Sequence, residues 1–128
     1  MNKEELKVQS ACKTRLDIWQ SKGVVVDYLD ISGLGKKCIR GIWVMHTRKG
    51  RPDLLAMFRN HDTCYNYLIE CKEPGGGHWG EEQIAYSKEF DGLYNVIYEV
   101  VTHPNQIDKT IDRITQFNQK VIDGITME

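Results

Sequence analysis

Two neighbouring runs of alternating apolar side chains constrain the fold of this chain more than any other feature. Residues 54–58 and 65–72 are rich in β-branched, aromatic and aliphatic side chains, and the polar segment 60–63 lies between them. This pattern predicts a β-hairpin that turns in the middle of the polar segment. The register that follows places Asp53 opposite Glu70, with both side chains on one face of the sheet.

Two carboxylates that face each other across a sheet are unfavourable without a partner. Like charges directly opposite one another destabilise a sheet by up to about 1 kcal/mol, and a bound cation reverses that sign. Mg²⁺ takes oxygen ligands in an octahedron and keeps several waters, so Asp53, Glu70 and a main-chain carbonyl would suit it. Lys72 lies on the same face as Glu70. In a hydrolytic site it would orient or activate the water molecule that attacks the substrate. The plain alternative is a salt-bridged surface hairpin, because an isolated acid-x-Lys triplet is usually only that.

Composition predicts a soluble globular protein. The chain has 128 residues, enough for one domain with a single sizeable core, and 41% of them are hydrophobic and 27% charged. No apolar stretch approaches the roughly 20 residues that span a bilayer, so no contact with a membrane is expected. The 4 cysteines follow no zinc spacing, and we expect reduced thiols in a cytoplasmic protein.

Basic residues are concentrated in one segment. The formal net charge is −1, yet residues 31–52 contain six basic side chains and no acidic one. Cationic contacts to the phosphate backbone supply most non-specific affinity for nucleic acids, so this segment predicts a phosphate-binding edge beside Asp53. A solvated basic loop is the alternative. The predicted DNA-binding residues are Lys36, Lys37, Arg40, Arg48, Lys49 and Arg51.

The first predicted element is an amphipathic helix over residues 3–21, and it places an acidic side chain within its apolar stripe. On a helical projection, Glu5 falls between the directions of Cys12 and Leu16. A carboxylate that points toward the core needs water or a cation partner, because burial of an unpaired charge is unfavourable. Glu4, at the margin of the stripe, is the competing candidate. A Glu in the first turn can also simply stabilise the helix through a favourable interaction with the helix dipole.

The remaining elements complete an α/β fold. The residue pattern predicts strands over 24–30, 39–47 and 95–101, a helix over 81–93, and a further helix after Pro104. The order α-β-β-β-β-α-β-α predicts a central mixed β-sheet flanked by helices. The last helix carries an apolar stripe that either covers the sheet or meets a partner: Ile107, Ile111, Ile114, Val121 and Ile125.

Gln83 lies near the start of the predicted helix 81–93, within its apolar stripe. From there its amide would reach the face of the hairpin that carries Glu70. A Gln at this position can also simply satisfy local backbone groups.

The order of these motifs resembles that of the PD-(D/E)XK nucleases, and more closely that of the VRR-NUC family. The residues that match the family's motif positions are Glu5, Gly50, Pro52, Asp53, Glu70, Lys72 and Gln83. The resemblance covers about residues 4–101 of a single domain, residues 1–128, and implies a restriction-endonuclease-like core. The chain departs from the family at Arg51, where an aliphatic residue is more usual, and in the helix of about residues 104–123.

The resemblance also implies a cofactor and a reaction, the cleavage of DNA with Mg²⁺ or Mn²⁺. Asp53, Glu70 and the Cys71 carbonyl would bind one metal ion, with Glu5 as a direct or indirect ligand or as the holder of a second ion. Cleavage would leave 5′-phosphate and 3′-hydroxyl ends. The attacking water would be positioned by Lys72 and Gln83.

Small stand-alone members of the family, which occur in phages and bacteria, look like dimeric nucleases that act on branched DNA such as four-way junctions. The resemblance therefore implies a homodimer in the cytoplasm of a bacterium or of a phage-infected host. The stripe of the last helix or residues 39–44 would supply the interface. The main alternative is a non-catalytic DNA-junction-binding or scaffold protein that retains the fold. An RNA-processing nuclease would need a separate set of Tyr, His and Lys.

Overall fold

The computed structural model describes residues 3–32, 36–45, 51–75 and 80–126, without the side chains of residues 36–39, 42–45 and 117–126. No helix in these described ranges is long and apolar enough to cross a membrane. The elements are α1 (Lys3–Ser21), β1 (Val25–Asp30), β2 (Lys36–Ile39), β3 (Ile42–Met45), β4 (Leu54–Asn60), β5 (Thr63–Cys71), α2 (Glu81–Glu89), β6 (Val96–Val101) and α3 (Asn105–Thr126).

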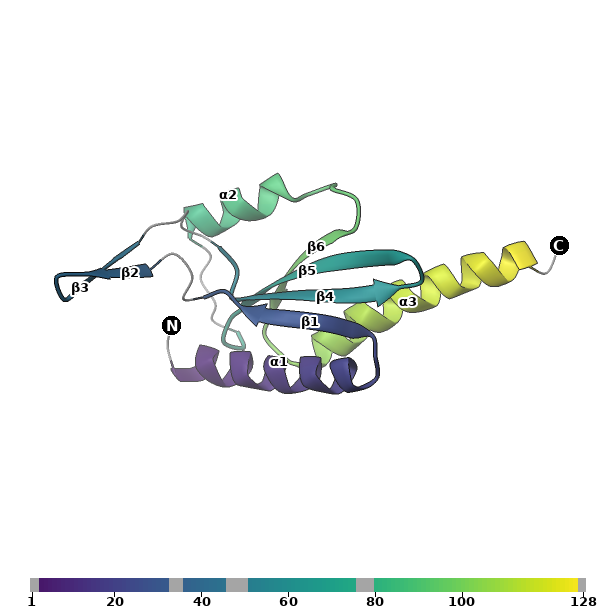
Figure 1. The fold of residues 1–128 in the computed structure, drawn as a ribbon, viewed down its shortest axis with the longest axis horizontal. Helices are drawn as coiled ribbons and strands as arrows, with labels where there is room; N and C mark the ends of the chain where they lie inside the picture. The colour runs from purple at the N-terminus through teal and green to yellow at the C-terminus, as the bar shows by residue number, and fades with distance from the viewer. Residues whose placement is uncertain (1–2, 33–35, 46–50, 76–79, 127–128) are drawn as a thin grey trace.

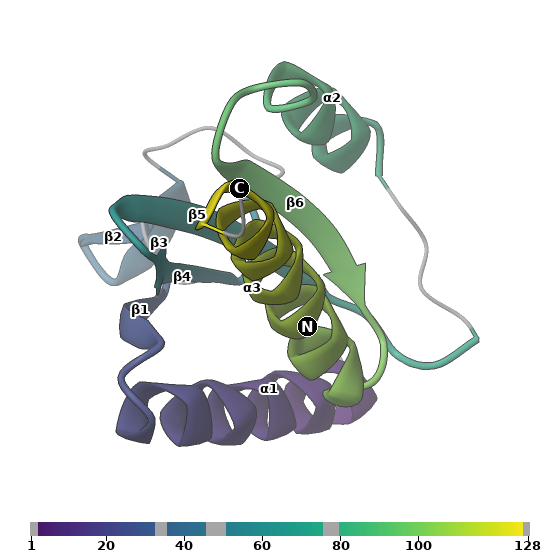
Figure 2. The ribbon, with the colours of Figure 1, turned by 90° about the vertical axis from the view of Figure 1, so that its right-hand side faces the viewer.

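A four-stranded mixed sheet forms the centre of the molecule, in the order β1-β4-β5-β6. The β1–β4 and β4–β5 pairs are antiparallel, whereas β5 and β6 are parallel and are joined through α2. Helix α1 lies along one side of the sheet and α2 along the other (Figure 1 and Figure 2). The predicted α/β class, a mixed sheet flanked by helices, is confirmed.

The central hairpin has the predicted register. Its pairs run from Leu54 with Ile69 to Asn60 with Thr63. Asp53 lies directly before β4, where its N–H donates to the Ile69 carbonyl at 3.0 Å and its own carbonyl accepts from the Ile31 N–H at 2.8 Å. Asp53 is therefore held by the backbone on both sides, at the end of the sheet where β5 reaches Glu70.

The predicted strand over residues 39–47 is only partly correct, since β3 covers Ile42–Met45 and residues 46–47 lie outside the described ranges. A turn at Arg40 and Gly41 divides the region into β2 and β3, which pair as a separate two-stranded sheet. Both turn residues have positive φ, 52° and 80°, and two consecutive left-handed residues suit a two-residue hairpin turn. The described residues thus contain one strand more than predicted, and this hairpin projects beyond the end of the main sheet (Figure 1).

The core lies between the sheet, α1 and the first half of α3. Ile107 and Ile111 of the predicted α3 stripe are fully buried in it, so this part of the stripe covers the sheet and is not available to a partner chain. The side chains of Val121 and Ile125 lie outside the described set. The other buried core residues are Val8, Cys12, Leu16, Val25, Leu54, Ala56, Phe58, Tyr67, Ile69, Cys71 and Val101.

Helix α2 ends earlier than its apolar spacing predicts. It stops at Glu89, and Gly92 follows with a φ of 78°, a conformation in which the chain cannot continue a helix. The two apolar residues predicted to extend the stripe, Leu93 and Tyr94, are 51% and 79% exposed. They lie in the turn that leads into β6 and do not face the core.

Candidate active site

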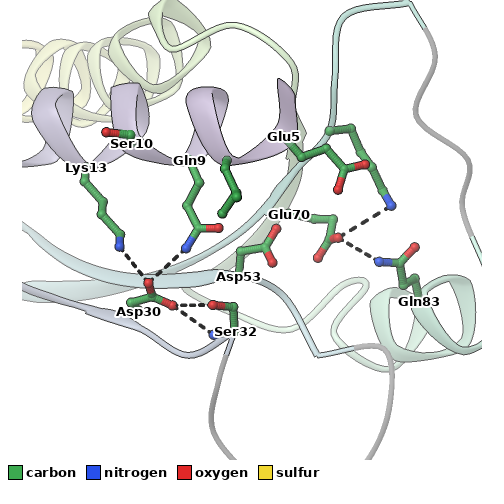
Figure 3. A pocket seen from close by; sticks show the side chains of 11 residues that line it. Glu5, Gln9, Ser10, Lys13, Asp30, Ser32, Asp53, Glu70 and Gln83 are labelled. Atoms are coloured by element: carbon green, nitrogen blue, oxygen red, sulfur yellow. Dashed lines mark hydrogen bonds and ion pairs between the residues drawn. The ribbon is translucent and has the colours of Figure 1, made fainter. Parts of the chain in front are cut away.

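A cleft of about 540 Å³ opens at the end of the sheet where β4 begins and β5 ends. Its walls come from α1, the end of β1, the start of β4, the end of β5 and the start of α2. Figure 3 shows that the side chains from these elements converge on one space. Five predicted site residues line the cleft: Glu5, Asp53, Glu70, Lys72 and Gln83.

The carboxylate of Asp53 is held in a fixed orientation at the cleft. Its Oδ2 accepts a hydrogen bond from the Cys71 N–H at 2.8 Å. Burial raises the pKa of Asp53 to about 6, against the lowering effect of the Cys71 bond and with a further increase from Glu5. The Cys71 thiol lies in the core, so only main-chain atoms of this residue stand beside Asp53.

Contacts with described residues hold Glu70 through only one of its two carboxylate oxygens. Its Oε1 accepts from Gln83 Nε2 at 2.7 Å and lies 3.8 Å from Lys72 Nζ. Its Oε2 is buried and has no hydrogen-bond partner among the described residues. Burial raises the pKa of Glu70 to about 8, and the negative charge of Asp53 adds to the increase.

Strand alternation explains why polar side chains are buried at this end of β5. Tyr67, Ile69 and Cys71 point into the core, so Glu70 and Lys72 point to the other face. Only 8% of Lys72 is exposed, and its N–H donates to the Val101 carbonyl at 3.0 Å. The backbone of Lys72 is therefore fixed directly after β5 by its bond to β6, and its ammonium group lies at the cleft.

Gln83 both satisfies a local backbone group and reaches the face that carries Glu70, the two roles considered from the sequence. Its Oε1 accepts from the Gly80 N–H at 3.2 Å and completes the N-terminus of α2. Its Nε2 donates to Glu70, which joins the start of α2 to the acidic end of β5.

Glu5, rather than Glu4, is the acid of α1 that lines the cleft. Glu4 is exposed and forms an ion pair with Lys7 at 3.3 Å. The charge of Glu5 adds to the effect of burial on the pKa values of Asp53 and Glu70. Figure 3 shows the three carboxylates of Glu5, Asp53 and Glu70 directed toward one another.

The donor set of the cleft suits a hard cation. Within the described ranges, no group of three or more His, Cys, Asp or Glu side chains is already arranged around a metal position. Mg²⁺ nevertheless binds proteins through one or two carboxylates and keeps several waters. Asp53 and Glu70 offer two such carboxylates, and the buried Oε2 of Glu70 is an acceptor that a cation would satisfy. The residues present therefore fit Mg²⁺ or Mn²⁺.

The predicted DNA-binding residues are only partly described. Arg40 is exposed at the tip of the β2–β3 hairpin, and Arg51 is half-buried two residues before Asp53. Lys36 and Lys37 lie on β2, but their side chains are outside the described set. Two further predicted DNA-binding residues and one motif glycine lie wholly outside the described ranges: Arg48, Lys49 and Gly50.

A polar cluster at the other end of the cleft was not predicted. Gln9 Nε2 and Lys13 Nζ both donate to Asp30 Oδ2, at 2.9 and 2.6 Å. Ser32 donates its N–H and its hydroxyl to Asp30 Oδ1, at 3.1 and 2.6 Å. The four-residue spacing of Glu5, Gln9 and Lys13 puts all three on one helix face, and this spacing could have revealed two members of the cluster.

Comparison of the chain with protein-family models, with curated proteins and with solved structures found no match. The resemblance to VRR-NUC nucleases therefore stays a prediction from the motifs. The functional inference below depends on the geometry of the cleft.

Proposed function

We propose that this protein is a metal-dependent DNA endonuclease that hydrolyses phosphodiester bonds with Mg²⁺ or Mn²⁺. The observation that carries the proposal is the pairing of two buried acids, Asp53 and Glu70, in a cleft that also holds the ammonium group of Lys72. Buried carboxylates without a cation or a full set of donors are unfavourable, so their retention together favours a cation-binding role. The restriction-endonuclease-like core implied by the VRR-NUC resemblance is part of this proposal.

The residues of the cleft would have different roles in such a site. Asp53 and Glu70, with the Cys71 main-chain carbonyl, would hold the metal, and Glu5 would act beside them. The bound metal supplies Lewis-acid polarisation of the phosphoryl oxygen and a lowered pKa for its water. Lys72, 3.8 Å from Glu70, would orient the attacking water. The Gln83 amide keeps the Glu70 carboxylate in place through a bond of 2.7 Å.

The proposed substrate is branched DNA, such as a four-way junction, and the proposed active form is a homodimer. A chain with one site makes one incision, whereas a two-fold dimer presents two sites to a two-fold junction. Arg40 and Arg51, with the other basic residues of 31–52, would contact phosphates. The projection of the β2–β3 hairpin beyond the sheet agrees with such a contact (Figure 1).

Paired substitutions test the metal site. Asp53→Asn and Glu70→Gln should each abolish Mn²⁺ binding in calorimetry and reduce DNA cleavage at least about 10³-fold, because each removes a ligand charge. Both variants should keep the circular dichroism spectrum of the wild type. Asp62→Asn, a matched change at the exposed turn of the same hairpin, should alter neither property. Full cleavage by Asp53→Asn or Glu70→Gln would contradict the proposal.

A substrate panel separates the parts of the proposal. Linear duplex, flap, four-way junction and single-stranded DNA should be assayed with Mg²⁺ and with Mn²⁺, and light scattering should give about twice the chain mass. A monomer that cuts linear duplex as well as junctions would contradict the dimer and the branched substrate but not the nuclease. Tight junction binding without cleavage would support the non-catalytic scaffold instead.

A further inference from the structure

Two glutamine side chains line the cleft, and they differ in how their amides are satisfied. Both ends of the Gln83 amide are used, by Gly80 and by Glu70. Gln9 is only 4% exposed, and its Nε2 donates to Asp30 at 2.9 Å. Its Oε1 is buried and has no hydrogen-bond partner within the described part of the chain.

The orientation of the Gln9 amide follows from chemistry. A carboxylate only accepts hydrogen bonds, so the nitrogen of Gln9 must be the atom that faces Asp30. Burial raises the pKa of Asp30, but the bonds from Lys13 and Ser32 outweigh it, and the pKa lies below its usual value. Asp30 therefore stays ionised and holds the nitrogen. Figure 3 shows the Gln9 oxygen turned away from Asp30, toward Asp53.

Two buried acceptors thus face one cleft without a donor from the described residues, Gln9 Oε1 and Glu70 Oε2. We call these two atoms the open acceptors. A buried acceptor that lacks a donor is unfavourable for the folded protein. Waters bound to Mg²⁺ or Mn²⁺ donate hydrogen bonds to their surroundings, and such ions keep several waters. A hydrated cation at Asp53 and Glu70 would satisfy both atoms, one through the ion and one through its water.

We propose that Gln9 is a positioning residue of the metal site, whose Oε1 accepts a hydrogen bond from a metal-bound water. Asp30 fixes the Gln9 amide so that the oxygen faces the cleft, and Lys13 and Ser32 hold Asp30 in turn. This inference rests on the proposed function, because the cation is the one proposed for Asp53 and Glu70. Loss of such an indirect partner typically weakens metal binding about 10- to 100-fold.

Gln9 could instead serve only to link α1 to β1 through its bond to Asp30. Two substitutions distinguish this structural role from the proposed role at the metal site. Gln9→Met keeps the length of the side chain but removes both the donor and the open acceptor. Gln9→Glu keeps an acceptor toward the cleft but removes the donor, and its carboxylate faces that of Asp30. Both changes remove the bond to Asp30, whereas only Gln9→Met removes the acceptor that faces the cleft.

The experiment measures Mn²⁺ affinity by calorimetry and the metal-free melting temperature of the full chain. Gln9→Met should weaken Mn²⁺ binding about 10- to 100-fold and leave the metal-free melting temperature unchanged or higher, because a buried open acceptor is removed. Gln9→Glu should keep or strengthen Mn²⁺ binding while the melting temperature falls. Gln20→Met removes an exposed bond from α1 to the Val26 carbonyl of β1, far from the acids of the cleft, and should leave Mn²⁺ affinity unchanged.

Gln9→Met with wild-type Mn²⁺ affinity would overturn the proposal. If Gln9→Met does not fold, Gln9→Glu becomes the deciding variant. Loss of Mn²⁺ affinity in folded Gln9→Glu would also overturn the proposed role of Gln9. Wild-type protein that binds no Mn²⁺ would overturn the proposed function and this inference together. Loss of Mn²⁺ binding in Asp53→Asn but not in Gln9→Met would overturn the role of Gln9 alone.

Discussion

Two polar clusters, one around the half-buried Glu99 and one in the cleft, differ in how completely their acceptors are paired. In the first, between β5, β6 and α3, Glu99 accepts from the Tyr67 hydroxyl and from the Thr110 hydroxyl, at 3.1 and 2.8 Å to its two oxygens. In the second, the cleft, Glu70 uses one oxygen for Gln83 and the other is an open acceptor.

This difference separates groups that stabilise the fold from groups that are available to a ligand. A fully paired buried cluster contributes to a unique packing, whereas a partly paired one is unfavourable in the free protein. Sequences tend to break such local rules at functional sites and to compensate for them elsewhere. Here the two clusters share the strand β5, so the contrast lies in the partners of each side chain and not in the element that carries it.

Among the substitutions that test this contrast, that of Lys72 should have the largest effect. Lys72→Met should reduce turnover about 10²- to 10⁴-fold at saturating DNA, the range expected when a group that orients or activates water is lost. Mn²⁺ affinity and DNA affinity should change little. Single-turnover kinetics with calorimetry would measure these quantities, and Lys88→Met, on the exposed face of α2, is the matched control. Lost DNA affinity with unchanged turnover would make Lys72 a phosphate contact instead.

The two clusters should also respond oppositely to loss of charge. Metal-free Glu99→Gln should lower the free energy of unfolding by about 1–3 kcal/mol, because an acceptor for Tyr67 or Thr110 is replaced by a donor. Metal-free Glu70→Gln should be neutral or stabilising near pH 8, because it removes a buried charge with an open acceptor. Urea unfolding of both variants measures the difference, and equal destabilisation would remove the contrast.

The pH dependence of the wild type follows from the same two acids. The folded-state pKa values, about 8 for Glu70 and about 6 for Asp53, are raised above the usual values of 4.5 and 3.8. The folded protein therefore holds these protons more tightly than the unfolded chain, and its stability falls as pH rises from about 4 to about 8. Mn²⁺ should restore stability at the upper end of that range, and Glu70→Gln should flatten the metal-free profile.

Much of the site was predictable because it depends on local pairing. Alternation and a short polar turn set the register that brings Asp53 near Glu70, and strand parity puts Lys72 on the same face. The turn at Arg40 and Gly41 was missed because apolar residues continue on both sides of it. The end of α2 was missed because helical spacing continues past Glu89 in residues that the turn exposes.

The contacts of Gln9 depend on tertiary packing, which limits their prediction. The spacing of Glu5, Gln9 and Lys13 shows that they share a helix face, but not which strand that face meets. Asp30 joins them only because α1 packs along β1. The open acceptors can be recognised only after both walls of the cleft are placed.

The smallest expected effect concerns two charges outside the two clusters, one before β4 and one near its end. Arg51 lies beside the cleft, whereas Arg59 is exposed near the hairpin turn. Arg51→Ala should weaken DNA binding a few-fold and reduce the slope of log affinity against log salt by about 0.9, the value for one lost phosphate contact. Arg59→Ala removes the same charge from the far end of β4 and should leave the slope unchanged. Fluorescence anisotropy over a salt series measures both, and a wild-type slope for Arg51→Ala would mean that Arg51 makes no phosphate contact.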